Sequence, residues 1–281
     1  MPDGQRSLPR RESPPPASPP GAALPFPYAD RIRRVEAAQV FDWLAKGWED
    51  VCAAGWVSFA YGAVFVVLGY AIGIGLAWFD MLYLLTPMIA GFLLVAPLLA
   101  VGLYRISARL ERGEAPGFID ALLAWRTNTF HILTAGLVLM LFMMIWVRIA
   151  ALIFAVSFPY TSMSFAALVQ QLATAEGLVF MAVGTAVGFC FAAAAFVLGA
   201  FALPMMLDRR ADVFAGAIVS AQAVFRSPQA MALWAAVIVV VTGFGLITAF
   251  FGLVVALPLI GHATWHAYRD VVRWEEDGED R

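Results

Sequence analysis

Long apolar runs without a single charged side chain dominate this sequence. No Asp, Glu, Lys or Arg occurs in residues 51–79, 81–104, 127–147, 149–175, 177–207 and 227–268. A helix needs about 20 residues to cross the hydrocarbon core of a bilayer, at about 1.5 Å per residue. The pattern therefore predicts an all-α protein, a polytopic membrane helical bundle.

The apolar runs divide into six expected transmembrane helices. The final run, 227–268, is too long for one span, and we divide it near Gly252. The third run is extended through Arg148 and ends before Pro159, because proline interrupts a helix. The expected spans are about 56–78, 82–104, 130–156, 178–206, 230–250 and 253–271.

A shorter amphipathic segment precedes each pair of spans, at residues 40–51, 118–125 and 214–225. In these segments apolar residues recur at i, i+3, i+4 and i+7, as on a helix that lies flat at a membrane surface. Asp212 is placed to cap the third segment. The sequence thus predicts six transmembrane helices as three hairpins, each preceded by an amphipathic interfacial helix. A fourth amphipathic stretch, 165–172, follows Ser164 between the third and fourth spans.

The two ends of the chain lack apolar periodicity. Nine of the sixteen prolines fall within residues 1–29, which is typical of a disordered segment. We expect a disordered Pro/Arg-rich cytosolic tail at 1–35, a six-span membrane domain at 36–272 and an acidic cytosolic tail at 273–281.

Composition and charge position agree with a membrane protein. The chain is 62% hydrophobic and 14% charged, against about 25% charged residues in typical soluble domains. Seventeen of the 18 Lys and Arg residues lie in the two tails and the segments between hairpins. The positive-inside rule therefore predicts a multi-pass protein with both termini cytosolic. A net charge of −2 argues against nucleic-acid binding.

Arg148 is the one basic residue that the expected topology places near the outer side. An ionisable group within a span is a functional candidate because its burial is costly. Arg148 either reaches the outer interface or pairs with Glu176 or Asp80, or it contacts an anion or lipid headgroup.

His262 and His266 stand four residues apart in the last expected span. This spacing puts both imidazoles on one helical face, as a two-ligand metal site requires. His131 is the only other histidine, so the histidines alone do not make a complete ligand set. Both residues are therefore weak metal candidates, with interfacial hydrogen bonding as the alternative, and no cofactor is predicted.

A third group of candidates lies at the expected cytosolic rim, where the sequence brings Arg beside Tyr or Asp. It includes Asp208, Tyr268 and Arg269. These side chains either anchor the helix ends at the interface or form a basic ring that contacts anionic lipid or a partner. No nucleophile elbow, phosphate-binding loop, zinc-protease or dinucleotide motif occurs in a plausible context. The sequence therefore favours a non-enzymatic protein.

Several stretches resemble an uncharacterised bacterial integral membrane family, domain of unknown function 2189 (DUF2189). They are GFLLVAPLLAVGLY at 91–104, LERGE at 110–114, Trp146-x-Arg148, Leu203-Pro204 and GHATWHAYRD at 261–270 (Thr264 aside). The resemblance spans roughly 40–272 and implies a polytopic protein of the bacterial cell inner membrane. Some members are labelled cytochrome c oxidase subunit I, but three histidines are too few for the haem and copper ligands of that subunit.

Three functions remain open from the sequence. The leading hypothesis is non-enzymatic handling or transport of a small or amphiphilic substrate, or support of a membrane complex. One alternative is a haem- or metal-binding redox protein using His262 and His266. The other is a membrane scaffold or assembly factor. The expected partners are the lipid bilayer and either anionic lipid or a membrane-complex subunit, and the oligomeric state is left open.

Overall fold

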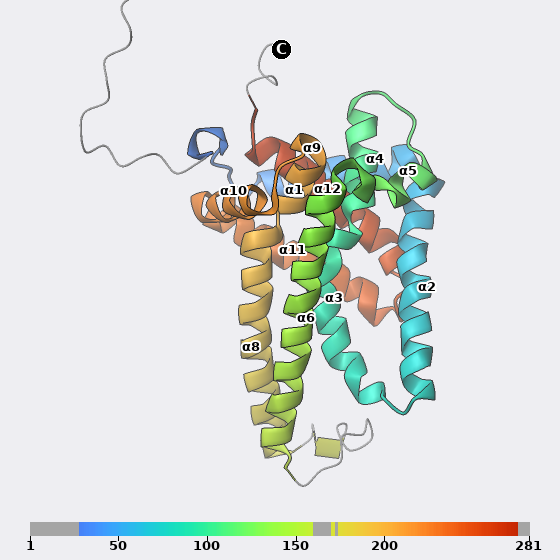
Figure 1. Ribbon diagram of the computed structural model, residues 1–281, viewed down its shortest axis with the longest axis vertical. Helices are drawn as coiled ribbons and strands as arrows, with labels where there is room; N and C mark the ends of the chain where they lie inside the picture. Colours follow the sequence, from blue (N-terminus) through green and yellow to red (C-terminus); the bar gives the residue numbers. More distant parts are fainter. Residues whose placement is uncertain (1–27, 160–169, 172–173, 275–281) are drawn as a thin grey trace, which may run out of the picture.

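The computed structural model describes residues 28–159, 170–171 and 174–274 (Figure 1). Within these residues the secondary structure is helical, apart from an isolated antiparallel bridge between Ile32 and Val272. The amphipathic stretch expected at 165–172 falls almost entirely outside the described residues.

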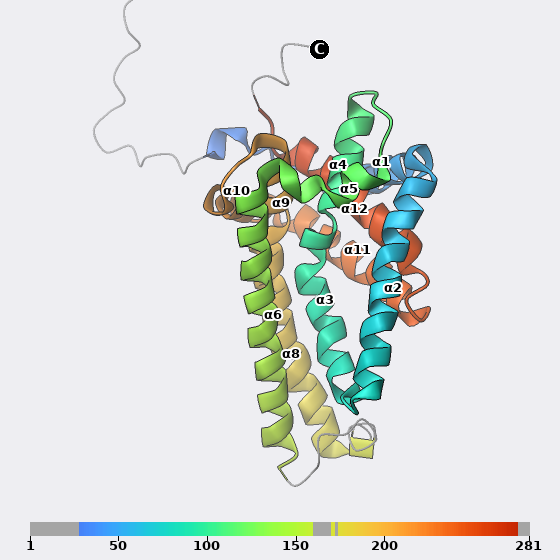
Figure 2. The same ribbon diagram turned by 45° about the vertical axis from the view of Figure 1, so that its right-hand side comes forward.

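Five helical segments are long and apolar enough to cross a membrane. Three of them combine consecutive helices. Gly91–Glu111 contains two helices that meet at Ala100, Ala175–Arg209 contains two that meet at Ala200–Phe201, and Ala124–Ser157 begins with a short 3-10 helix. Figures 1 and 2 show α6 and α8 lying side by side along the long axis of the molecule. The helices that form the five segments are α2 (Trp56–Trp78), α3 (Leu85–Leu99, from Gly91 on) with α4 (Val101–Glu111), η3 (Ala124–Asn128) with α6 (Thr129–Ser157), α8 (Ala175–Gly199) with α9 (Ala202–Arg209), and α11 (Pro228–Ile247).

The sixth expected span corresponds to α12 (Leu253–Val271), which is not among these five segments. Figures 1 and 2 show α11 and α12 as an oblique hairpin whose turn lies beside α2. At that turn the Tyr70 hydroxyl donates to the Ala249 carbonyl, 2.6 Å away. Tyr70 stands eight residues before the end of α2, so the turn lies about 12 Å short of that end. The expected arrangement of six spans in three transmembrane hairpins is therefore not confirmed for this pair.

The amphipathic segments lie across one end of the bundle, as Figure 1 shows for α1 (Gln39–Ala54), α10 (Val213–Arg226) and α5 (Phe118–Leu122). A short helix, η3 (Ala124–Asn128), follows α5. The predicted cap of α10 is confirmed, because the Asp212 carboxylate accepts from the Ala215 amide at 2.8 Å. On α10, Phe214 and Phe225 are exposed whereas Val219 and Ala223 are buried. This apolar exposed face fits a helix at a membrane surface.

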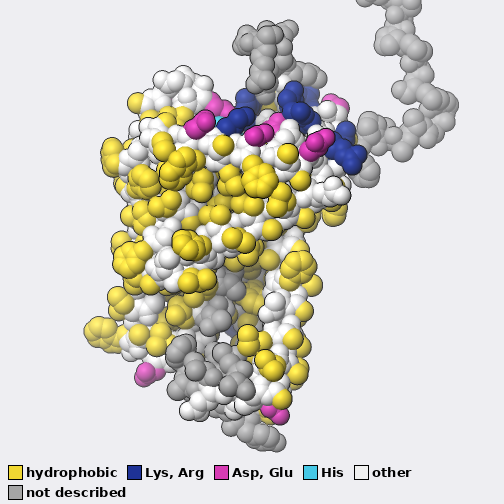
Figure 3. Space-filling view, turned by 180° about the vertical axis from the view of Figure 1, so that it is seen from behind, with side chains coloured by type: hydrophobic (Ala, Val, Ile, Leu, Met, Phe, Trp, Pro, Cys, Tyr) yellow, Lys and Arg dark blue, Asp and Glu magenta, His cyan; other side chains and the backbone are white. Residues whose placement is uncertain are grey.

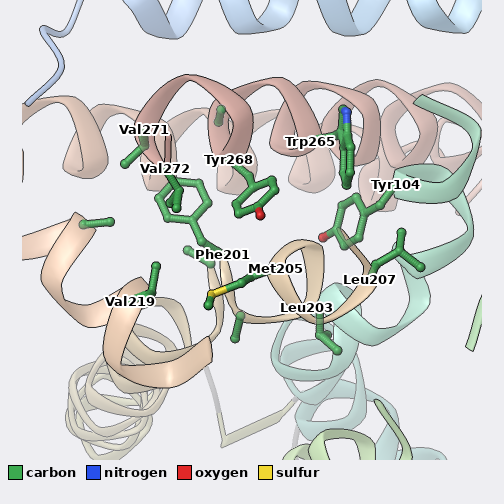
Figure 4. Close-up of a cluster of buried hydrophobic side chains, with 14 of the residues drawn as sticks. Tyr104, Phe201, Leu203, Met205, Leu207, Val219, Trp265, Tyr268, Val271 and Val272 are labelled. Carbon is green, nitrogen blue, oxygen red and sulfur yellow. The ribbon is translucent and has the colours of Figure 1, made fainter. Parts of the chain in front are cut away.

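Most cations gather at the same end, which we call the charged end. Figure 3 shows Lys and Arg side chains concentrated there above a broad apolar surface. The charged end also contains the main hydrophobic core. Figure 4 shows Trp265 and Tyr268 pointing from α12 towards the segment that carries Phe201 and Met205. The core therefore joins α12 to the interfacial helices rather than running the length of the bundle.

Residues 28–35, assigned from the sequence to the amino-terminal tail, pack against the opposite end of the chain. Ile32 and Val35 are buried, and Ile32 bridges to Val272. The Val35 amide donates to the Ser227 hydroxyl at 3.0 Å. The first and last described segments thus lie together at the charged end.

Candidate functional site

The His262 side chain stands at the crossing of α12 with α2 and α4, and it is fully buried. Its Nε2 lies 2.9 Å from the Ser58 hydroxyl, and its Nδ1 lies 2.7 Å from the Ser107 hydroxyl. Both serines are also fully buried. Each polar atom of this imidazole therefore has a partner, as buried polar groups require.

Asp50, at the end of α1, joins this arrangement from the surface. Its Oδ2 accepts from the Ser107 hydroxyl at 2.5 Å and lies 2.9 Å from His266 Nε2. The Asp50 and His266 side chains are each 14% exposed. We call Asp50, Ser58, Ser107, His262 and His266 the His262 cluster.

The direction of the hydrogen bonds follows from the Asp50 carboxylate. A carboxylate oxygen accepts, so the Ser107 hydroxyl donates its one proton to Asp50. Ser107 then accepts from His262 Nδ1–H, and Nε2 accepts from the Ser58 hydroxyl. Burial lowers the pKa of His262 from 6.5 to about 4, so the imidazole is neutral near pH 7. A neutral imidazole has the one donor and one acceptor that this chain of bonds needs.

Close helix contacts hold α12 at this crossing. A Cβ on Gly47 of α1 would lie 2.7 Å from the Ala263 amide nitrogen. A Cβ on Gly62 of α2 would lie 2.6 Å from the Val254 carbonyl oxygen. Only glycine allows the backbones to approach so closely. The chain therefore places α12 against α1 and α2 by backbone contact rather than by long side chains.

A second polar group lies further along α12, at the charged end. The Tyr268 hydroxyl donates to Asp208 at 2.9 Å, and Arg269 lies 3.7 Å from the same carboxylate. Arg269 also pairs with Glu111 at 3.5 Å, and Arg209 pairs with Asp208 at 3.2 Å. Three predicted site residues, Asp208, Tyr268 and Arg269, are thus brought together. Their charges are compensated within the protein, so this part of the rim is not a free basic ring.

Arg148 lies apart from both groups. It is exposed on α6, and within the described part of the chain it has no ion pair or hydrogen bond. Glu176 is exposed at the start of α8, and among the described residues it does not pair with Arg148, so this one of the alternatives for Arg148 is not seen.

Sequence reasoning missed Asp50, Ser58 and Ser107. Asp50 comes 216 residues before its partner His266, and nothing in the local pattern links the two. The available signal was an acidic residue near the end of an amphipathic helix, but that pattern is common on solvated helix faces.

The His262 cluster does not offer a metal ion the ligands that the histidine spacing suggested. No group of three His, Cys, Asp or Glu side chains with metal-binding geometry occurs among the described residues. Both ring nitrogens of His262 lie within hydrogen-bonding distance of serine hydroxyls. A metal at His262 would have to displace one of these bonds in a fully buried position, and this arrangement does not fit a resident metal or haem.

An apolar pocket of about 230 Å³ is lined by residues of α2, α3, α4, α5, η3 and α6. Tyr61 of α2, one helical turn after Ser58, forms part of its wall and donates its hydroxyl to the Leu99 carbonyl at 2.9 Å. The pocket is partly open, and its wall residues Leu122 and Leu133 are substantially exposed. We call it the lateral pocket; its walls are Tyr61, Leu98, Val101, Gly102, Ala121, Leu122, Ala124, Trp125, Ile132 and Leu133.

Residues 85–208 match the family model DUF2189, described as a predicted integral membrane protein. The match confirms the resemblance seen in the sequence over this part of the chain. It includes α3 to α9, and thus Ser107, most of the lateral pocket and Arg148, while α1, α2 and α12 lie outside it. No curated protein and no solved structure matches the chain.

Proposed function

We propose that this multi-pass integral membrane protein binds the apolar chain of an amphiphile in the lateral pocket. The observation that supports this proposal is the pocket itself, which is apolar, partly open and placed near the charged ends of α2 and α6. Of the three functions left open by the sequence, this one corresponds to handling an amphiphilic substrate.

The size of the pocket limits what it holds. Sites for whole drug-sized ligands have volumes of roughly 300–1,000 Å³, and 230 Å³ is smaller. The pocket therefore suits a segment of an acyl chain, with the rest of the molecule outside. Lipid tails already surround the protein, so burial from water does not drive this binding. Affinity depends instead on packing inside the pocket and on polar contacts at its mouth.

The position of the pocket indicates which leaflet supplies the amphiphile. Its walls include α5 and η3, which lie at the charged end. By the positive-inside rule this end faces the cytosol, and we place both termini there. The amphiphile then comes from the cytosolic leaflet of a bacterial inner membrane.

The other two functions have less support. A transport path for a small polar solute needs a polar cavity, and the lateral pocket does not include Arg148 among its walls. A redox role through His262 and His266 conflicts with the hydrogen bonds that occupy both His262 nitrogens. A scaffold role needs no pocket, and it is the outcome if the pocket proves empty in the membrane.

The experiment uses a phospholipid with a photoreactive group in its acyl chain, added to membranes that contain the protein. We expect crosslinks to concentrate on peptides that contain Leu122, Trp125 and Leu133. Leu133→Trp fills the mouth of the pocket and should reduce this labelling several-fold. Leu137→Trp is the matched control, since Leu137 is similarly exposed one turn further along α6 and is not a pocket residue. Equal labelling of all lipid-facing helices, or no effect of Leu133→Trp, would contradict the proposal.

A further inference from the structure

The lateral pocket has a cationic side chain at its edge. Trp125 is a wall residue, and the Arg126 guanidinium stacks on its ring with its central carbon 5.5 Å from the ring centroid. Arg126 is exposed. Stacking fixes the plane of a guanidinium but leaves its N–H groups at the edge free to bind oxygen atoms.

The backbone around Arg126 is held in place. The Arg126 amide donates to the Leu123 carbonyl at 2.9 Å, and the Thr129 hydroxyl donates to the Arg126 carbonyl at 3.3 Å. Asn128 ties the end of η3 to α9 through its side-chain amide, which donates to the Met206 and Ala211 carbonyls. The position of Arg126 beside the pocket is thus set before any ligand arrives, which lowers the entropic cost of binding.

The neighbouring cations Arg109 and Arg112 are compensated by carboxylates, but Arg126 is not. Arg109 pairs with Asp120 and Glu114, and Arg112 pairs with Glu114. Within the part of the chain that the structure describes, Arg126 and Arg105 have no carboxylate partner.

Arg105 occupies a related position on α4. It follows the pocket residues Val101 and Gly102 by four and three positions, so it lies on the same helical face, one turn closer to the charged end. Two uncompensated cations thus stand on two of the elements that form the pocket.

From this arrangement we infer that the amphiphile is an anionic phospholipid of the bilayer, with its acyl chain in the lateral pocket and its phosphate-containing headgroup at Arg126. The inference rests on the proposed function and adds the class of headgroup. An apolar pocket beside an uncompensated guanidinium matches a molecule with one apolar chain next to one negative charge. A zwitterionic lipid gains less at this position, because its positive group offsets the attraction.

The test measures binding of two defined lipids, phosphatidylglycerol and phosphatidylcholine, to the delipidated full-length protein by native mass spectrometry. A basic residue next to an anionic headgroup accounts for about a fivefold change in affinity. We expect phosphatidylglycerol to bind at least about fivefold more tightly than phosphatidylcholine. Arg126→Gln should remove about that factor for phosphatidylglycerol and leave phosphatidylcholine unchanged. Arg105→Gln should act in the same direction.

Two control variants separate a specific headgroup contact from general charge and from folding. Arg126→Lys keeps the positive charge but loses the planar guanidinium with its paired N–H donors. It should therefore retain part of the preference for phosphatidylglycerol over phosphatidylcholine. Arg34→Gln removes an exposed cation on the segment that packs near Ser227, and it should leave the preference unchanged. An equal effect of Arg34→Gln and Arg126→Gln would overturn the inference.

The remaining outcomes distinguish the inference from the proposed function. If Leu133→Trp weakens both lipids but Arg126→Gln weakens neither, the pocket binds a chain and the headgroup assignment is wrong. If Leu133→Trp weakens neither lipid, the proposed function itself fails, and the inference fails with it.

Discussion

Replacement of His262 by leucine tests whether the His262 cluster holds α12 in place. The substitution removes two hydrogen bonds and leaves the buried Ser58 hydroxyl without its acceptor. Each bond contributes about 1 kcal/mol, and an unsatisfied buried group costs about 1–3 kcal/mol. Ser107 keeps Asp50 as its acceptor, and Ser58 can turn to a backbone carbonyl of its own helix. The expected loss of stability is therefore about 2–4 kcal/mol near pH 7.

His262 also makes the stability of the protein depend on pH in a definite direction. Burial holds the pKa of His262 at about 4, whereas an unfolded chain has its ordinary value near 6.5. The unfolded state therefore binds more protons between these two values, and wild-type stability falls as the pH drops from about 6.5 towards 4. Across this window the loss reaches about 3 kcal/mol. His262→Leu lacks this contribution, so the stability difference between wild type and variant should shrink on acidification.

Thermal unfolding in mild detergent, followed by tryptophan fluorescence from pH 7.5 to 4.5, measures both effects. A loss of 2–4 kcal/mol corresponds to a midpoint lower by roughly 5–15 °C for a chain of this size. His131→Leu is the control, since His131 is only half-buried near the start of α6. The reasoning is refuted if His262→Leu melts within a degree of wild type at pH 7.5, or if the gap between them is the same at pH 4.5.

Three further predictions concern packing and topology. Gly47→Ala should lower the melting midpoint, because its Cβ would lie 2.7 Å from a backbone nitrogen and overpacking costs about 1–3 kcal/mol. Gly73→Ala is the control and should leave the midpoint unchanged, because a Cβ there would have no atom within 4 Å. Single cysteines at Asp80→Cys and Phe251→Cys, in a protein whose native cysteines are replaced, test whether α12 spans the membrane. An impermeant thiol reagent added on the side opposite the charged end should label Asp80→Cys but not Phe251→Cys. Labelling of both would show that α12 is a sixth span. Arg148→Ala should change the unfolding free energy by less than about 0.5 kcal/mol, whereas a clear loss of folded protein would indicate a partner for this side chain.

The interfacial helices were predictable because their signal is local. On α10 the buried residues Val219 and Ala223 and the exposed Phe214 follow the helical period, and Asp212 caps the helix as expected. Periodicity and capping depend on residues within one or two turns, so one sequence is enough to identify them.

Hydropathy did not show in the same way whether the last apolar helix crosses the membrane. Apolar side chains are stable both in lipid and in a protein core, so an uncharged run of 42 residues, 227–268, does not indicate which of the two surrounds it. The structure assigns α12 to a protein environment, with Leu253, Ala256 and Trp265 buried among other helices.

The candidate site, too, was partly predictable from the sequence and partly decided by the tertiary structure. The sequence by itself determined that the chain is a helical membrane protein with its cations at one end, and that His262 and His266 share a helical face. Only the tertiary structure decided that Asp50, Ser58 and Ser107 meet these histidines, and that Trp125 and Arg126 stand beside a pocket. The physical reason is that hydropathy and helical period are properties of neighbouring residues. Partners across helices depend on how the helices cross, and here the close approach at Gly47 and Gly62 sets that crossing.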